Sequence, residues 1–301
     1  MSHRVVIVGS GHVGSTAALL LALEGLFADI VLVDKRPARS HAEADDMMAA
    51  LPRMGVVSNV RGGSVSDCAN ADVVVIAAAA PVKLGQTRND MFIKNAAIIG
   101  ELVPAIENSD FSGLYLIVSN PVDLLSYFMV DALGVETERV LGMGTLLDSM
   151  RLEDVLRAEY DTAHVHAFTL GEHGEGLVVD WSRTLADERA VPEADRERLR
   201  RSAIDAAYAI MKGKGSTSYG IAAAVVEVLR TWQSGSASVL PLSMQLSGEY
   251  GIDGISLAVP AAFDCNGVPS VQAVDLDVET IKALQKTAGV MRSLYRDLRA
   301  M

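Results

Sequence analysis

A glycine pattern near the N-terminus constrains the fold of this chain more than any other feature. Gly9, Gly11 and Gly14 follow the apolar run 5–8 and open a stretch, 14–23, that is typical of a helix. In such a strand–turn–helix unit the first glycine permits the tight turn, the second lets backbone approach a pyrophosphate, and the third lets helix and strand pack closely. The free N–H groups at the helix start suit the pyrophosphate charge. A purely structural glycine turn is the less favoured alternative.

Asp34 adds the second part of a dinucleotide-binding pattern. It ends the apolar run 30–33 and stands twenty residues after Gly14. A carboxylate at this point accepts hydrogen bonds from a ribose diol and repels a 2′-phosphate. The sequence therefore predicts NAD as cofactor in preference to NADP. Lys35 and Arg36 weaken that preference, because neighbouring cations can support a phosphate.

The first half of the chain alternates between two kinds of segment. Apolar runs predict strands at 5–8, 30–33, 73–79, 114–118 and 140–141, and helices are expected at 14–23, 42–51, 87–106 and 122–133. Nearly continuous apolar strands separated by helices indicate parallel β-α-β units buried on both faces. We expect an α/β fold with a doubly wound parallel sheet of the Rossmann type.

The second half has a different pattern. Helices are predicted at 148–159, 192–212, 218–229 and 278–298, and short strands at 165–170, 176–181, 256–260 and 267–274. This mixture is typical of an α+β domain with antiparallel strands. We place the boundary near Gly142, which divides the chain into a dinucleotide-binding domain, 1–142, and a catalytic or substrate domain, 143–301.

Composition excludes several classes of protein. The 301 residues are 50% hydrophobic and carry a net charge of −12, which argues against binding to nucleic acid or to an anionic membrane. The longest apolar run, 73–82, is half the length of a membrane span. No secretory signal is visible, and Cys68 and Cys265 are too few for a disulfide framework or a cysteine-based zinc site. We expect a cytoplasmic protein without a metal.

Four polar side chains suggest chemistry when they are taken together. His173 lies in the segment 171–174 with a glycine at each end, Asp148 and Arg151 are three residues apart on a predicted helix, and Arg88 follows a strand. Singly, each has a plain explanation as a structural histidine, a surface ion pair or a solvated charge. Together they suit hydride transfer between NAD and a hydroxy acid. Histidine exchanges the proton, a carboxylate orients it, one guanidinium binds the substrate carboxylate and another stabilises developing charge.

Six ordered segments resemble the L-lactate/malate dehydrogenase family. They are the glycine pattern with Asp34, the pair Thr87-Arg88, and the segments 119–123 (SNPVD), 147–151 (LDSMR), 171–174 (GEHG) and 214–218 (KGSTS). Each motif is modest by itself, but the ordered set is specific and extends from residue 5 to about residue 229. The resemblance implies an NAD-dependent enzyme that interconverts an L-2-hydroxy acid and its 2-oxo acid.

The resemblance also implies catalytic roles. His173 would be the acid/base, paired with Asp148, and Arg151 would bind the substrate carboxylate. Arg88, on a loop that closes over the substrate, would polarise the carbonyl group. Asn120, expected to precede a cis proline, would orient the substrate.

Further roles follow for the pocket walls. Thr217 would line the substrate pocket, and Ile221 would pack on the nicotinamide. The implied cofactor-binding residues are Gly9, Gly11, His12, Val13, Gly14, Asp34, Ala78, Asn95, Val118, Asn120 and Ile221.

The position that sets substrate specificity in the family departs from the usual pattern. Six residues before Arg88, malate enzymes carry arginine and lactate enzymes carry glutamine, whereas this chain has Val82. Valine cannot pair with a second carboxylate, and leaving that charge desolvated would cost several kcal/mol. We therefore expect a monocarboxylic 2-oxo acid such as pyruvate or an aliphatic analogue, and disfavour oxaloacetate. A one-residue shift could bring Lys83 into the pocket, although a solvated lysine is the favoured interpretation.

A second departure concerns regulation. Some bacterial lactate enzymes bind a sugar bisphosphate between subunits, through an arginine two residues after the substrate arginine and a histidine seven before the catalytic one. Here these positions are Glu153 and His166. Because a carboxylate repels phosphate, we expect no such activation.

Other readings of the chain remain open. The stretch 43–51 matches the helix that pairs subunits in the family, which favours a homodimer or homotetramer, although packing within one chain would suit it equally. Alternatives for function are a malate dehydrogenase, a non-catalytic NAD-binding redox sensor, and an NAD-dependent glycosidase. A glycosidase of that kind normally needs a metal held partly by cysteine, and neither cysteine lies beside a catalytic segment.

Overall fold

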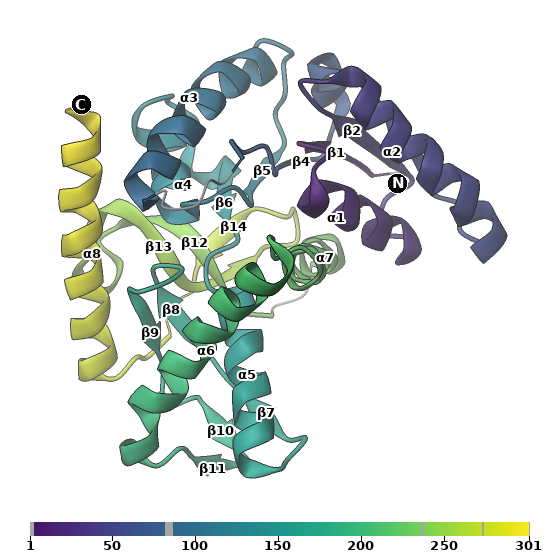
Figure 1. Cartoon of the computed structure of the whole chain (residues 1–301). Coiled ribbons are helices and arrows are strands. Elements are labelled where there is room, and N and C mark those ends of the chain that lie inside the picture. Colours follow the sequence, from purple (N-terminus) through teal and green to yellow (C-terminus); the bar gives the residue numbers. More distant parts are fainter. Residues whose placement is uncertain (1–2, 82–86, 236–237, 273, 301) are drawn as a thin grey trace.

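A parallel sheet forms the N-terminal half of the chain. The computed structural model describes residues 3–81, 87–235, 238–272 and 274–300. Six strands lie in the order β3-β2-β1-β4-β5-β6 and pair in parallel (Figure 1). Their bounds are β1 (Arg4–Val8), β2 (Asp29–Val33), β3 (Asn59–Gly62), β4 (Val73–Ile76), β5 (Leu114–Ile117) and β6 (Val140–Gly142). The order reverses beside β1, which confirms the predicted doubly wound sheet.

Helices connect these strands and cover both faces of the sheet. They are α1 (His12–Leu23), α2 (Pro37–Ala50), α3 (Arg88–Glu107) and α4 (Val122–Asp131), with short 3₁₀ turns η1 (Leu51–Met54), η2 (Val65–Asn70) and η3 (Thr137–Arg139). The start of α3 is set by a capping box, in which Thr87 and Asp90 each accept the other's backbone N–H. This cap fixes the position of Arg88, the first helical residue.

The sheet continues into the C-terminal half without a break. Strands β12 (Leu240–Ser247), β13 (Asp253–Phe263), β8 (Thr169–Gly171) and β9 (Leu177–Val179) extend it antiparallel from β6, and β14 (Pro269–Val271) pairs with β13. A separate small sheet contains β7 (Val165–His166), β10 (Leu185–Ala186) and β11 (Arg189–Ala190). Mixed strands of this kind confirm the α+β pattern expected for this half.

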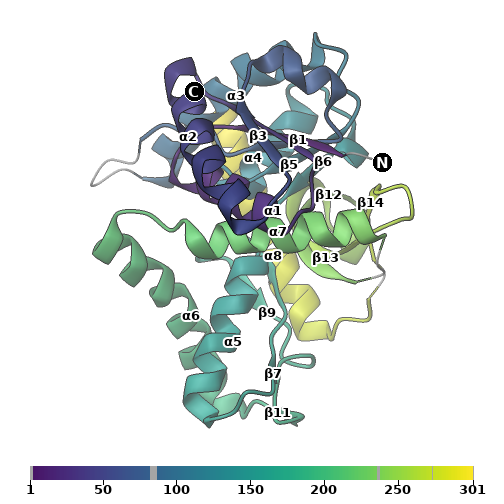
Figure 2. The ribbon, with the colours of Figure 1, turned by 90° about the vertical axis from the view of Figure 1, so that its right-hand side faces the viewer.

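The remaining helices place the second half against the first. They are α5 (Leu146–Tyr160), α6 (Glu193–Lys214), α7 (Tyr219–Ser234) and α8 (Val278–Arg299), with a 3₁₀ turn η4 (Glu249–Gly251). Helix α7 packs on α1, while α5 and α6 pack together and extend away from the parallel sheet (Figure 2). One hydrophobic core joins strands and helices of both halves, so the junction between them is a fixed structure rather than a loose linker.

Several predicted elements differ from the structure. Strands β3 and β12 were not anticipated: β3 is short and polar, and β12 contains Pro241, a residue that ordinarily disfavours a central strand. The run 165–170, predicted as one strand, is divided between β7 and β8 in different sheets. Helix α2 begins five residues earlier than predicted because Pro37 occupies its first turn, where a missing N–H costs nothing.

None of the helices in the described part of the chain is both long and apolar enough to cross a lipid bilayer.

Candidate active site

The glycine turn after β1 has the geometry expected of a pyrophosphate-binding loop. Gly9 has a φ of +104°, and its N–H donates to the carbonyl oxygen of Val33 at 2.7 Å. A Cβ at Gly14 would overlap the carbonyl oxygen of Gly9, whereas one at Gly11 would meet no atom within 4 Å. Helix α1 has no side-chain cap, so its first N–H groups are free to bind an anion. The loop therefore fits a dinucleotide.

Asp34 lies at the carboxyl end of β2 and holds this loop. Its carboxylate accepts the N–H and hydroxyl of Ser10, both at 3.1 Å, and the N–H of Arg36 at 3.0 Å. Burial works to raise the pKa of Asp34, but the hydrogen bonds from Arg36 and Ser10 outweigh it and the pKa lies below its ordinary value. The residue is therefore an anion at neutral pH, as contact with a ribose diol requires.

A cavity of about 250 Å³ opens beside this loop, at the carboxyl ends of β4 and β5. Its lining contains the predicted site residues Val13, Asn95, Val118, Asn120, Arg151, His173, Thr217 and Ile221. The predicted residues Gly9, Gly11, His12, Gly14 and Asp34 lie outside that lining, in the turn and at the end of β2. Ala78 is also outside it: its backbone lies against Gly9, and its carbonyl oxygen accepts the hydroxyl of Ser119.

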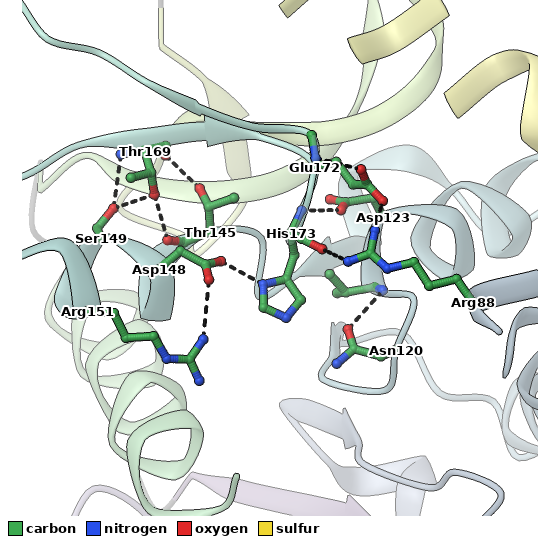
Figure 3. Close-up of polar contacts among 12 residues, drawn as sticks. Arg88, Asn120, Asp123, Thr145, Asp148, Ser149, Arg151, Thr169, Glu172 and His173 are labelled. Atoms are coloured by element: carbon green, nitrogen blue, oxygen red, sulfur yellow. Dashed lines mark hydrogen bonds and ion pairs between the residues drawn. The ribbon is translucent and has the colours of Figure 1, made fainter. Parts of the chain in front are cut away.

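His173 and Asp148 form a hydrogen-bonded pair (Figure 3). The imidazole Nδ1 lies 2.6 Å from Oδ2 of Asp148, which is 4% exposed on the first turn of α5. The negative charge of Asp148 raises the pKa of His173 above its ordinary value, against the opposing effect of burial. Because Nδ1 is engaged by the carboxylate, Nε2 is the nitrogen left for a ligand in the cavity.

A polar network fixes the helix that carries Asp148. Thr145 and Thr169 exchange hydroxyl-to-carbonyl hydrogen bonds at 2.6 and 2.9 Å, and the hydroxyl of Ser149 contacts the Thr169 hydroxyl at 2.8 Å (Figure 3). All three side chains are buried. Fully bonded buried networks make one arrangement strongly preferred, so α5 and β8 hold a defined relative position.

Arg151 shares the face of α5 with Asp148. One of its terminal nitrogens lies 3.2 Å from Oδ1 of Asp148, and the side chain, although only 9% exposed, lines the cavity. In the described part of the chain, no second hydrogen-bond partner holds this guanidinium. The structure thus combines both interpretations of the spacing: Arg151 is an i,i+3 ion-pair partner and also a cavity cation.

Arg88 enters the site from the start of α3. Its guanidinium pairs with the carboxylate of Glu172 and donates to the carbonyl oxygen of His173 at 2.7 Å. It passes over Gly174, which has a φ of +132° and where a Cβ would overlap the guanidinium. Arg88 therefore lies beside His173, with part of its hydrogen-bonding capacity already used.

Asn95 and Asn120 connect two loops of the N-terminal half. The buried Asn95 side chain accepts the N–H of Ala80 at 2.8 Å and donates to the carbonyl oxygen of Asn120 at 2.6 Å. The Asn120-Pro121 peptide is cis, as expected from the resemblance. The Asn95 side chain thus holds together two loops that surround the cavity, and both its oxygen and its nitrogen are hydrogen-bonded to backbone.

A second cavity of about 400 Å³ adjoins the first and shares Met91, Asn120, Arg151, His173 and Thr217 with it. Its apolar wall comes largely from α6 and includes Ile204, Ala207 and Met211. Val82 and Lys83, on which the specificity prediction rests, lie outside the described residues.

Asp123 and Glu172 lie in the segments 119–123 and 171–174, where the sequence by itself indicates no role for either residue. The structure places Glu172 on Arg88, and Asp123 on the backbone N–H of His173. No group of three metal-ligating side chains occurs among the described residues.

Comparisons with known proteins agree with this geometry. Residues 3–142 match the family model described as lactate/malate dehydrogenase, NAD binding domain, and residues 145–299 match lactate/malate dehydrogenase, alpha/beta C-terminal domain. An L-lactate dehydrogenase of Lactococcus lactis subsp. cremoris is 32% identical, with 99% of each chain covered. L-lactate dehydrogenase 2 of Bacillus cereus is 36% identical, with 95% of this chain and 97% of that protein covered.

Solved structures give the same result. The ligands-bound form of the minor L-lactate dehydrogenase from Enterococcus mundtii superposes with a TM-score of 0.92 at 30% identity, covering 98% of each chain. A lactate dehydrogenase from a Medee basin deep-sea metagenome library has a TM-score of 0.91 at 31% identity, covering 99% of each.

Proposed function

The chain belongs to the lactate/malate dehydrogenase family of NAD-dependent 2-hydroxy acid dehydrogenases, and we propose that it reduces a monocarboxylic 2-oxo acid with His173 as proton donor. The observation that carries this proposal is the 2.6 Å contact between His173 and Asp148 beside a cavity that also contains Arg151. This arrangement supplies a proton and a carboxylate-binding cation at one place. The reverse reaction, oxidation of the L-2-hydroxy acid, uses the same groups in the opposite direction.

The side chains divide the work of the reaction. NADH, when bound, supplies the hydride. His173 donates the proton from Nε2 to the carbonyl oxygen of the substrate, and Asp148 keeps Nδ1 protonated and stabilises the imidazolium. Because Asp148 raises the pKa of His173, it favours the imidazolium form from which the proton is donated.

The two arginines hold the charges of the substrate. Arg151, on the rigid α5, would bind the carboxylate in a bidentate manner. Arg88 would stabilise the charge that develops on the carbonyl oxygen. Asn120, held by Asn95 at its backbone, would orient the substrate between them.

The proposed substrate class follows from the wall of the larger cavity. Its described cations are Arg88, Arg151 and His173, and the proposed reaction already assigns all three to the carbonyl group and to a single carboxylate. The wall formed by α6 contains Ile204, Ala207 and Met211 and no cation, and the hydroxyl of its one polar member, Tyr208, donates to Glu175 at 3.4 Å. A second carboxylate placed there would lose its hydration without gaining a partner, which costs several kcal/mol. These features support pyruvate or an aliphatic 2-oxo acid.

A substrate panel tests this proposal. We would measure kcat/KM for pyruvate, 2-oxo-4-methylpentanoate and oxaloacetate, each with NADH and NADPH. We expect a monocarboxylic acid and NADH to be preferred, and the Val82→Arg variant to improve oxaloacetate selectively. Oxaloacetate winning by tenfold, about 1.4 kcal/mol, would overturn the substrate class. Preference for NADPH would contradict the role of Asp34, and NADH binding without any turnover would favour a redox sensor.

We also propose a homodimer or homotetramer in the cytoplasm. The family resemblance along 43–51 supports the assembly. Cys68 and Cys265 are both unpaired, in agreement with a reducing compartment.

A further inference from the structure

Asp123 is a buried carboxylate that the proposed reaction does not use. It lies in the first turn of α4 and is 2% exposed. Its Oδ2 accepts the backbone N–H of His173 at 3.0 Å, across fifty residues of sequence (Figure 3). We propose that Asp123 is a positioning residue for His173, whose carboxylate holds the loop that carries the imidazole in register with Asn120. This inference rests on the proposed function, since it concerns the histidine assigned there.

The two segments joined by this hydrogen bond come from different halves of the molecule. Asn120 lies between β5 and α4, and Asp123 lies three residues later in the first turn of α4, both in the N-terminal half. His173 lies in the connection between β8 and β9, in the C-terminal half. A proton donor and a substrate-orienting amide must keep their separation to within a fraction of an ångström for efficient transfer. The Asp123 carboxylate is a direct polar link between the segments that carry them.

The burial of this carboxylate is unfavourable by itself. The Ser243 hydroxyl and the His173 N–H favour the charged form of Asp123, but burial outweighs them and raises the pKa of Asp123 to about 6. A residue that served packing alone would not need a charge at this point, because an isosteric amide or an apolar side chain avoids the desolvation. The start of α4 offsets part of the cost, since a helix N-terminus stabilises an anion.

The surrounding charges decide how Asp123 acts on the site. Glu172 and His173 face it from the β8–β9 connection, and Ser243 faces it from β12. Arg88 from α3, and Asp148 and Arg151 from α5, line the same cavity. Glu172 disfavours the charge on Asp123, whereas His173 favours it. Conversely, the anionic Asp123 adds to the effect of Asp148 in raising the pKa of His173.

Two variants separate the hydrogen bond from the charge. Asp123→Asn keeps an acceptor for the His173 N–H but removes the charge, so kcat should stay within roughly threefold while the pKa of His173 falls. Asp123→Ala removes both, so kcat should fall by about tenfold or more with little change in NADH affinity. Ser126→Ala is the matched control, because among the described residues its buried hydroxyl donates only to the carbonyl oxygen of Val122 in the same helix.

The measurements are kcat, KM, the dissociation constant of NADH, and the titration of histidine resonances by NMR, assigned with a His173→Asn variant. If Asp123→Ala changes only the melting temperature, as Ser126→Ala would, or if it leaves the His173 backbone and ring resonances where they are in Asp123→Asn, the inference is overturned. These NMR measurements do not depend on turnover. A wild-type enzyme inactive on every 2-oxo acid would overturn the proposed function, while His173 resonances displaced in Asp123→Ala but not in Asp123→Asn would still support the positioning role.

Discussion

Asp148 is the residue on which most of the site converges. Its two carboxylate oxygens bind His173 and Arg151 separately, at 2.6 and 3.2 Å, inside a largely buried environment. One side chain thus orients both the proposed proton donor, His173, and the guanidinium of Arg151 that is proposed to bind the substrate carboxylate. Removing its charge should therefore affect acid–base behaviour and substrate binding at the same time.

The pH dependence of Asp148→Asn is the sharpest test at this scale. Reduction of a 2-oxo acid needs the imidazolium form, so activity should fall as pH rises through the pKa of His173, which lies above 6.5 in the intact protein. Without the Asp148 charge this pKa drops, so the alkaline limb of the kcat/KM profile should move to lower pH, and the rate should fall about 10²-fold.

Asp154→Asn provides the control for this variant. Asp154 lies on the same helix, is 77% exposed, and pairs only with Arg157 among the described residues. It should leave the profile unchanged. An alkaline limb that stays in place in Asp148→Asn would contradict the proposed pair.

The sequence identifies the residues with distinctive chemistry, but it does not show which residues far apart in the chain contact one another. The ordered motifs singled out His173, Asp148 and Arg151. Nothing along the chain shows that Glu172 contacts Arg88 or that Asp123 contacts His173, because those pairs are 84 and 50 residues apart and meet only through the tertiary fold.

At the scale of elements, strand and helix patterns were predicted best where burial is complete. The strands β1, β2, β4 and β5 are apolar except for Arg4 and Asp29 at the starts of β1 and β2, and their buried apolar runs made them recognisable. By contrast, β12 is a central strand whose Pro241 lies opposite Pro260 of β13. Its place in the sheet comes from long-range pairing with β13, which local sequence does not encode.

The turn between β1 and α1 offers a test with a built-in comparison. Gly14→Ala places a Cβ against the carbonyl oxygen of Gly9, so helix and strand must separate and the free energy of unfolding should fall by roughly 1–3 kcal/mol. Gly11→Ala meets no neighbour, so it should leave stability nearly unchanged while weakening NADH affinity, because the pyrophosphate approaches there.

Chemical denaturation and NADH fluorescence titration measure these two effects independently. If Gly11→Ala were the more destabilised protein and bound NADH normally, the loop would have a structural role rather than the cofactor role given to it.

At the scale of the whole molecule, one sheet and one core unite the N-terminal half and the C-terminal half. The site lies where these halves meet, with α3 and α4 contributing from one side and α5 and α6 from the other. The relative placement of His173 and Asn120 is therefore a property of the complete fold, and neither half alone contains the site.

Regulation between subunits can be tested at this scale. Glu153 and His166 stand at the two positions that bind a sugar bisphosphate in some bacterial lactate enzymes. The Glu153 carboxylate pairs with Arg157 at 3.0 Å. We expect fructose 1,6-bisphosphate to leave the rate unchanged, because the Glu153 carboxylate repels phosphate. We expect light scattering to show a dimer or a tetramer. Steady-state assays with and without the bisphosphate decide the point, and a large activation would contradict the prediction. Glu153→Arg tests whether charge reversal alone creates sensitivity.

Gly174 limits how the site can be altered by evolution or engineering. Arg88 occupies the space that a side chain at this position would fill, so any mutant must either displace the arginine or deform the connection after His173. A saturation library at position 174 should thus return glycine among its active clones. A substitution at Arg88 would make room for a side chain there, but it would also remove the guanidinium assigned to the developing charge, so a joint library at the two positions should not restore activity.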